Sequence, residues 1–298
     1  MCEFCTKHGE GKKWYLQMKN YSRELVNAQL SPAQQAAAGV ATRGQWLGGF
    51  MSGFVRADNV DAASSPRPSG SSAGASAAPR TESEIVELRK IVHFGQVIPM
   101  TDVEAVLDQV TSITRVPCGC RYISTGKADK RYCFGLGYDP TGIMGKYPDS
   151  SSGLEVLSSK EAKRIIREYD KEGLIHSIWT GVTPYVIGLC NCDHDCLAYR
   201  GYIEQGGPAS FFRAEYVAEV DPELCTGCKS CMKQCQFGAQ FYSSLLKRVY
   251  IGPQRCFGCG VCMARCKHDA IKLLPRNEHP KVSNLWLKQP EAGSQAPR

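Results

Sequence analysis

The sequence predicts an α+β protein in which a compact cysteine repeat follows a mixed α/β module and an N-terminal helical segment. Two observations lead to this class. Short β-branched runs alternate with helix-start signals along the middle of the chain, and a four-cysteine pattern occurs twice near its end. The 298 residues are enough for two domains. The expected parts are residues 1–61, 62–80, 81–215, 216–275 and 276–298.

The first part, residues 1–61, combines a CxxC pair, Cys2 and Cys5, with a helical pattern. Four large apolar residues recur at spacings of four, three and four, which places them on one face of a helix: Trp14, Met18, Tyr21 and Leu25. We expect this helix to dock on its own protein. Residues 62–80 contain only Ala, Ser, Pro and Gly apart from two arginines, which predicts a flexible linker.

The middle part, residues 81–215, is predicted to be a mixed α/β module. Three helices are expected from capping-box patterns, in which a hydroxyl residue precedes Glu by three positions: Thr81 with Glu84, Thr101 with Glu104, and Ser158 with Glu161. The third helix should end at Gly173, because glycine suits the left-handed residue that closes a helix. Apolar runs such as "TPYVIGLC" predict short strands, and the cysteines fall at segment ends.

The cysteine repeat is an internal duplication. "CTGCKSCMKQC" starts at Cys225 and "CFGCGVCMARC" starts at Cys256, thirty-one residues later, with the same spacings of two, two and three. The offset also aligns other residues, among them Gly227 with Gly258 and Met232 with Met263. One small supersecondary unit therefore occurs twice.

This spacing suits a pair of 4Fe-4S clusters. Two residues between thiolates let a tight loop wrap one cluster, and a fourth thiolate three residues later is directed toward the other cluster. One quartet is therefore Cys225, Cys228, Cys231 and Cys266. The second quartet is Cys256, Cys259, Cys262 and Cys235.

Residues 216–275 resemble a bacterial two-cluster ferredoxin, and all eight cysteines match the motif of that family. The departure is the proline that usually follows the fourth cysteine, which is replaced here by Gln236 and Lys267. A zinc site is the alternative for any cysteine quartet, although zinc ligands usually come as separated CxxC pairs.

Six further cysteines precede the repeat: Cys118, Cys120, Cys133, Cys190, Cys192 and Cys196. With "CGCR", "GLIH" and "LCNCDHDC" they make residues 81–275 resemble multi-cluster iron-sulfur proteins of strict anaerobes, which implies a third 4Fe-4S cluster. Cys2 and Cys5 would complete a fourth, or form half a zinc site with His8, or bind nothing. Both thiols of a CxC pair are expected to serve one cluster only if the chain bends. His194 is a further ligand candidate, although a histidine beside a cluster more often donates a hydrogen bond.

Cysteine content and charge indicate the compartment and the partners to expect. The chain has 16 cysteines, no secretory signal pattern and no long uncharged apolar run, so we expect a cytoplasmic protein with reduced thiols and no membrane insertion. From Cys225 to Lys272 there are eight basic residues and one acid, Asp269. Such charge would stabilise anionic clusters and favour redox partners with an acidic docking face.

Catalytic motifs for dinucleotides, nucleoside triphosphates or acyl transfer are missing from the sequence. We therefore favour a non-catalytic electron-transfer subunit of an anaerobic oxidoreductase over an enzyme in its own right. Two alternatives remain open. One is an iron-sulfur enzyme whose middle cluster has only three cysteine ligands. The other, ranked lower, is a redox-sensing protein that binds nucleic acid through its basic segment.

Overall fold

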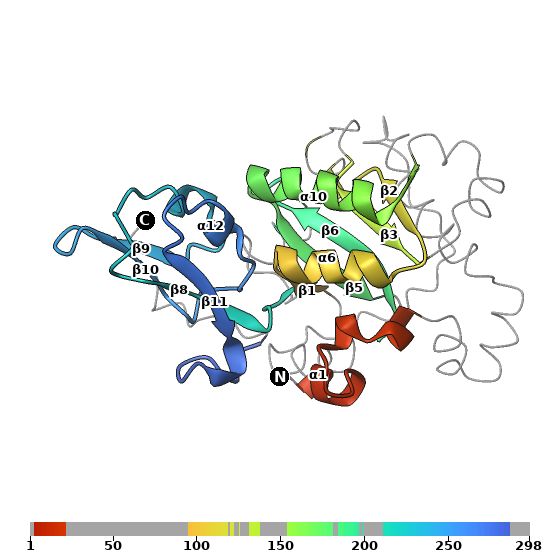
Figure 1. Ribbon diagram of the computed structural model, residues 1–298, viewed down its shortest axis with the longest axis horizontal. Coiled ribbons are helices and arrows are strands. Elements are labelled where there is room, and N and C mark those ends of the chain that lie inside the picture. The colour runs from red at the N-terminus through yellow and green to blue at the C-terminus, as the bar shows by residue number, and fades with distance from the viewer. Residues whose placement is uncertain are drawn as a thin grey trace, which may run out of the picture.

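The computed structural model describes residues 3–21, 95–118, 120–121, 125, 131–137, 154–180, 184–196, 199 and 211–286. Cys2, Leu25, the predicted linker and the helix expected after Thr81 lie outside these ranges. Helices and sheets occur together, as an α+β class requires. Figure 1 shows a sheet module with its helices at the right and the cysteine repeat, in blue, at the left. None of the helices in the described ranges has the length and apolar content needed to cross a bilayer.

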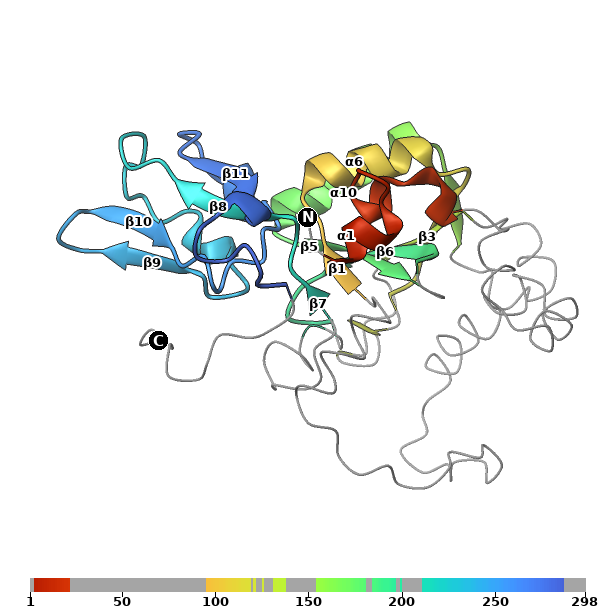
Figure 2. The same ribbon diagram turned by 90° about the horizontal axis from the view of Figure 1, so that it is seen from below.

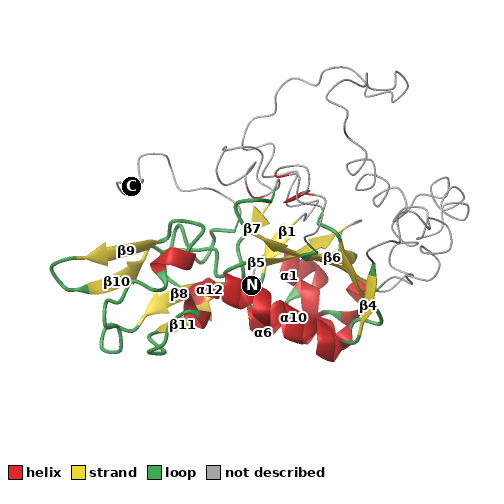
Figure 3. Cartoon of the chain, turned by 90° about the horizontal axis from the view of Figure 1, so that it is seen from above, coloured by secondary structure: helices red, strands yellow, loops and turns green. Residues whose placement is uncertain are grey.

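The sheet module is a seven-stranded sheet of order β4-β2-β3-β6-β5-β1-β7. All neighbours pair antiparallel except β1 with β7. Its strands are β1 (Gly95–Val97), β2 (Ile113–Val116), β3 (Cys133–Leu136), β4 (Glu155–Leu157), β5 (Ile175–Thr180), β6 (Val186–Cys192) and β7 (Phe211–Phe212). Two helices, α6 (Met100–Gln109) and α10 (Ser159–Glu172), lie on one side of the sheet (Figure 3). The part "VIGLC" of the run "TPYVIGLC" lies in β6, as predicted.

Helix α10 starts and ends where the sequence predicts. The Ser158 hydroxyl accepts from the Glu161 backbone N–H, and the Glu161 carboxylate accepts from the Ser158 backbone N–H, which completes a capping box. Gly173 closes the helix with φ 93°. The prediction for α6 is wrong at its start, because Pro99 occupies the N-cap and Thr101 already lies inside the helix. Proline is favoured near helix starts because it has no N–H to leave unpaired.

The N-terminal segment docks on the sheet module but is not one continuous helix. It folds as α1 (Glu3–His8) and two 3-10 turns, η1 (Trp14–Leu16) and η2 (Met18–Tyr21). Trp14 and Tyr15 are fully buried against the helix side of the sheet, while Met18 stays exposed. The expected docking is confirmed. The expected helical face through Trp14 and Met18 is wrong, because the chain turns between them.

The cysteine repeat has a two-fold arrangement of strands. The strand before the first motif, β8 (Tyr216–Val220), pairs with the strand after the second, β11 (Ile271–Pro275). The strand after the first motif, β9 (Gln240–Ser243), pairs with the strand before the second, β10 (Arg248–Ile251). A 3-10 turn, η4 (Met232–Gln234), and a short helix, α12 (Val261–Ala264), follow the two cysteine loops. The two copies are therefore interleaved rather than placed side by side.

The duplication is visible in the backbone as well. Positive φ angles occur at three pairs of positions separated by thirty-one residues: Gly227 with Gly258, Lys229 with Gly260, and Gly238 with Asp269. A Cβ on Gly227 would lie 2.1 Å from the Lys247 carbonyl oxygen, and one on Gly258 would lie 2.1 Å from that of Tyr216. Both cysteine loops therefore require glycine at the point where they meet the neighbouring strand.

The seven-stranded sheet has a buried core on each face. The helix face packs Ile178 and Leu189 against α6, α10 and the N-terminal segment (Figure 2). The opposite face packs Ile175 and several of the middle cysteines against residues of the repeat. Alternation along β5 and β6 explains this division, because successive side chains point to opposite faces.

Residues 276–286 belong to the predicted C-terminal tail but are folded in the structure. A 3-10 turn, η5 (Arg276–Glu278), follows β11, and Arg276 and Val282 are buried. The Arg213 backbone N–H donates to the Trp286 carbonyl oxygen at 2.8 Å. Residues 276–286 therefore pack on the protein and close one side of the repeat.

Candidate metal centres

Two cavities in the repeat coincide with the two predicted cysteine quartets. One, with about 340 Å³ of space free of protein atoms, is lined by Cys225, Cys228, Cys231 and Cys266. The other, of the same size, is lined by Cys235, Cys256, Cys259 and Cys262. Each quartet thus combines three thiols of one motif with the fourth thiol of the other. We call these the first and the second cavity.

The thiols of the two cavities differ in exposure. In the first cavity, the Cys228 thiol is exposed, and backbone N–H donation from Ser230 lowers its pKa. In the second, Cys256 and Cys262 are buried, and burial raises the pKa of Cys262 well above its usual value. An exposed thiol therefore lines the first cavity, whereas the four thiols of the second are buried or half-buried.

Backbone groups are arranged to receive anionic sulfur in the second cavity. The Cys256 sulfur accepts from the Ala218 and Gly258 backbone N–H groups, each at 3.3 Å. The Cys235 sulfur accepts from the Ala239 N–H, also at 3.3 Å. Such bonds favour the thiolate form that iron requires.

Two buried arginines flank the loop that enters the second cavity. Arg276 donates to the carbonyl oxygens of Ala214, Tyr216 and Cys256 at 2.7 to 2.8 Å. The Arg213 guanidinium lies 4.4 Å from the centre of the Phe257 ring. Burial lowers the pKa of Arg276 to about 10, against the attraction of the Cys256 thiolate, so the group stays charged at neutral pH.

The residues of the second cavity fit an anionic four-iron cluster. Arg276 is fully buried, and its Nη1 has no hydrogen-bond partner among the described residues. An isolated buried cation is costly unless an opposite charge lies nearby. Glu215 is one acid that acts on Arg276, and a cluster with four thiolates would add negative charge beside Cys256.

The middle cysteines gather on the sheet face opposite the helices. Cys133 on β3 lies directly opposite Cys190 on β6. Cys192 follows two residues later on the same face of β6. Cys118 comes two residues after Val116, the β2 partner of Cys133, and so continues that face. The CxC pair of β6 therefore needs no bend to bring both thiols to one site, and the prediction that it does is wrong.

Contacts among the sulfur atoms connect five of these thiols in a closed ring. Hydrogen bonds from the Cys133 and Cys196 thiols lower the pKa of Cys118 to about 3, and bonds from Cys133 and Cys192 lower that of Cys190 to about 7. Cys192 and Cys196 are also in contact. Cys120 lies near enough to Cys190 to raise its pKa electrostatically. We call these six cysteines the thiol ring.

A buried arginine completes the thiol ring. The Arg121 Nη2 pairs with the Asp193 carboxylate at 2.6 Å, and the guanidinium lies 4.2 Å from the centre of the Tyr132 ring. Its charge acts on the Cys118 and Cys196 thiols. The sequence contains this residue in "CGCR", but nothing in its spacing indicated a cation beside the sulfurs. His194 is exposed, and its ring packs edge-on against Tyr199 at 5.3 Å.

The thiol ring and the second cavity share one buried core. Cys118, Cys192 and Cys196 belong to the same group of packed residues as Phe257 and Cys259. The Phe237 and Phe257 rings stack there, with centroids 3.9 Å apart. Gln236 links the modules, since its Nε2 donates to the Gly173 carbonyl oxygen at 2.6 Å and to that of Cys192 at 3.5 Å. Gln236, which replaces the proline usual in ferredoxins, thus forms a contact between the two modules.

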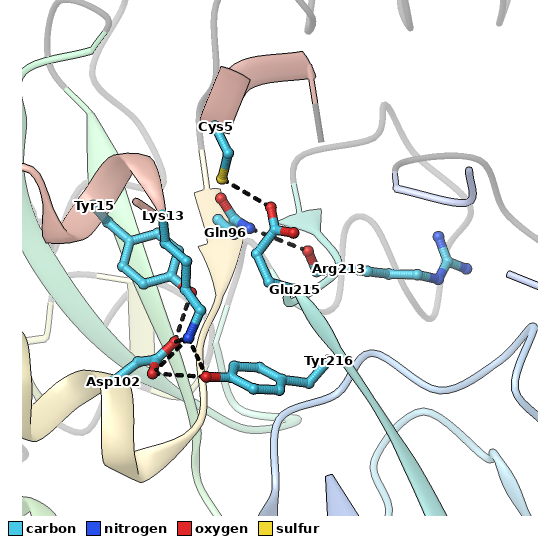
Figure 4. Close-up of polar contacts among 8 residues, drawn as sticks. All are labelled: Cys5, Lys13, Tyr15, Gln96, Asp102, Arg213, Glu215 and Tyr216. Carbon is cyan, nitrogen blue, oxygen red and sulfur yellow. Dashed lines mark hydrogen bonds and ion pairs between the residues drawn. The ribbon is translucent and has the colours of Figure 1, made fainter. Parts of the chain in front are cut away.

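Cys5 lies apart from the thiol ring. It is fully buried in the core of the helix face, and its thiol donates to the Glu215 carboxylate at 2.9 Å (Figure 4). Nearby, the Asp102 carboxylate accepts from Lys13, from Tyr15 at 2.7 Å and from Tyr216 at 3.0 Å. Lys13 also donates to the Tyr216 hydroxyl. These bonds connect the N-terminal segment to both modules.

Asp102→Asn is expected to weaken docking of the N-terminal segment by about 1 to 3 kcal/mol, because Lys13 then keeps a partly buried charge without its partner. Amide hydrogen exchange across residues 3–21 should speed up accordingly. Asp108→Asn is the matched control, since the Asp108 carboxylate pairs with Lys163 at the surface. Equal exchange in both variants would contradict the assigned role of Asp102.

Comparison with known proteins bears on the repeat alone. Residues 224–271 match the family described as a 4Fe-4S dicluster domain. A comparison with curated proteins finds no match. The matched range contains all eight cysteines that line the two cavities. The chain thus contains a 4Fe-4S domain of the ferredoxin type at residues 224–271.

Proposed function

We propose that this protein carries electrons through three 4Fe-4S clusters as the iron-sulfur subunit of a larger anaerobic oxidoreductase in the cytoplasm. Two clusters belong to the cavities of the ferredoxin-type domain. The third belongs to the thiol ring. A bound 4Fe-4S cluster gains and loses one electron at a time. The protein itself supplies the thiolates, the buried cations and the exclusion of water.

The observation that carries this proposal is the shared core of the thiol ring and the second cavity. Cys192 and Cys196 belong to the same packed core as Phe257 and Cys259, so the two sites lie close together. Electron transfer weakens steeply with distance, and direct packing keeps the distance short. The cluster of the first cavity, which has the exposed Cys228, would then exchange electrons with a partner protein.

The thiol ring is suited to metal rather than to disulfides. Cys133 and Cys190 are free thiols although they lie directly opposite each other on one sheet face. Reduced thiols gathered in this way are typical of iron-sulfur proteins in a reducing compartment. Arg121 lies against the ring as Arg276 lies against the second cavity, and a buried cation at each site suits an anionic cluster.

The test is the iron and acid-labile sulfide content of protein purified without oxygen, with zinc measured alongside. We expect about twelve of each per chain and no zinc. About eight irons together with zinc would contradict the proposal at the thiol ring. About sixteen would add a fourth cluster and make Cys2 and Cys5 its candidate ligands.

A further inference from the structure

The tip of the β9–β10 hairpin carries two adjacent exposed leucines. Leu245 is 88% exposed and Leu246 is 55% exposed. Four of the large exposed apolar side chains in the described ranges lie in the ferredoxin-type domain: Leu224, Leu245, Leu246 and Tyr250. A concentration of apolar surface on one module is typical of a site that another protein covers.

This tip lies beside the loop of the first cavity. The close approach of the Lys247 carbonyl oxygen to Gly227 places the end of the hairpin against the Cys225–Cys231 loop. The Lys229 ammonium lies 3.8 Å from the centre of the Tyr242 ring on β9. The same loop presents the exposed Cys228. A protein seated on the leucines would therefore lie next to the first cavity.

The second cavity is covered on another side by the sheet module. Phe257 and Cys259 pack into the core that contains the thiol ring, and Gln236 bonds across the contact. The two cavities therefore have different surroundings, since the second packs against the sheet module and the first has an exposed cysteine. Among the described residues, the hairpin side is the approach that leads directly to an exposed cysteine.

Positive charge lies beside the apolar tip. Lys229 and Lys247 are exposed, and Arg248 is half-buried. No acidic residue occurs between Cys225 and His268 in the sequence, while Asp221 and Glu223 precede the first cysteine loop. An apolar centre with a mainly basic rim is complementary to a partner with an apolar centre and an acidic rim.

We propose that the β9–β10 tip is the docking surface for a one-electron redox protein with an acidic rim. This inference rests on the proposed electron-transfer function. With a cluster bound by the cysteines of the first cavity, one electron would pass from the partner's reduced flavin or iron-sulfur group to that cluster, with no transfer of atoms. Leu245 and Leu246 supply the apolar contact, and Lys229, Lys247 and Arg248 orient the partner.

The test uses stopped-flow reduction by an acidic flavodoxin in its reduced state as the protein probe and dithionite as the small reductant. Leu245→Gln combined with Leu246→Gln should lower the second-order rate with flavodoxin about tenfold, the scale of a lost interface hot spot. Lys247→Gln should flatten the salt dependence of that rate. Val156→Gln is the matched control, because Val156 is 58% exposed on β4 of the sheet module.

Dithionite separates the two proposals. Reduction by dithionite at equal rates in all variants, with flavodoxin slowed only by the hairpin changes, would support the docking surface. Equal flavodoxin rates in the hairpin and Val156 variants would overturn it, and so would a wild-type protein that dithionite reduces but flavodoxin does not. Failure of dithionite to reduce any cluster would overturn the electron-transfer function itself.

Discussion

Replacing Cys133, Cys190 and Cys192 together by serine is expected to remove about four irons and four sulfides per chain. The three thiols share one face of β3 and β6, at the centre of the thiol ring. Six thiols could substitute for one another if a single cysteine were changed. The triple variant leaves Cys118, Cys120 and Cys196, one thiolate fewer than the four that usually hold a 4Fe-4S cluster.

The matched control for this variant is Cys5→Ser. Cys5 is fully buried but donates to Glu215 on the other side of the sheet, so the iron content of this variant should equal that of the wild type. Electron paramagnetic resonance of the reduced triple variant should retain the signals of the two clusters in the ferredoxin-type domain. Unchanged iron in the triple variant would contradict a cluster at the thiol ring.

Arg276→Gln is expected to lower the reduction potential of the cluster proposed for the second cavity, while that of the cluster proposed for the first cavity changes little. Reduction adds one negative charge, and Arg276 places a fully buried cation beside Cys256. The expected shift is on the order of 60 mV, the equivalent of about 1.4 kcal/mol for one electron. The variant should also lose about 3 kcal/mol of stability, because three buried carbonyl groups lose their donor.

Potentiometric titration followed by electron paramagnetic resonance would measure both potentials in one sample. Lys229→Gln is the control at the first cavity. Its charge is exposed and screened by solvent, so its removal should shift the reduction potential much less. A shift of both potentials by the same amount in Arg276→Gln would point to general loosening of the domain rather than to a local charge.

The parts of this protein that the sequence predicts are those determined by local chemistry. The capping box at Ser158 and the left-handed Gly173 depend on neighbouring residues only, and both are confirmed. The eight cysteines of the repeat are predicted for the same reason, since their spacing reflects the geometry of one loop and its copy. Their two cavities contain the expected quartets.

The parts that the sequence misses depend on contacts between distant segments. Arg276 lies twenty residues from Cys256, and its role follows from the path of the chain after β11. The thiol ring needs the register of β3 with β6, which no local pattern provides. The helix expected through Trp14 breaks into turns because Trp14 and Tyr15 must reach Gln96 and Asp102 in the sheet module.

The Gln236 contact also implies an order of events during folding. Its two acceptors are backbone carbonyl groups, at Gly173 after helix α10 and at Cys192 at the end of strand β6. Neither oxygen is in place until α10 has terminated and β6 has joined the sheet. The ferredoxin-type domain can therefore settle onto its neighbour only after that neighbour has folded.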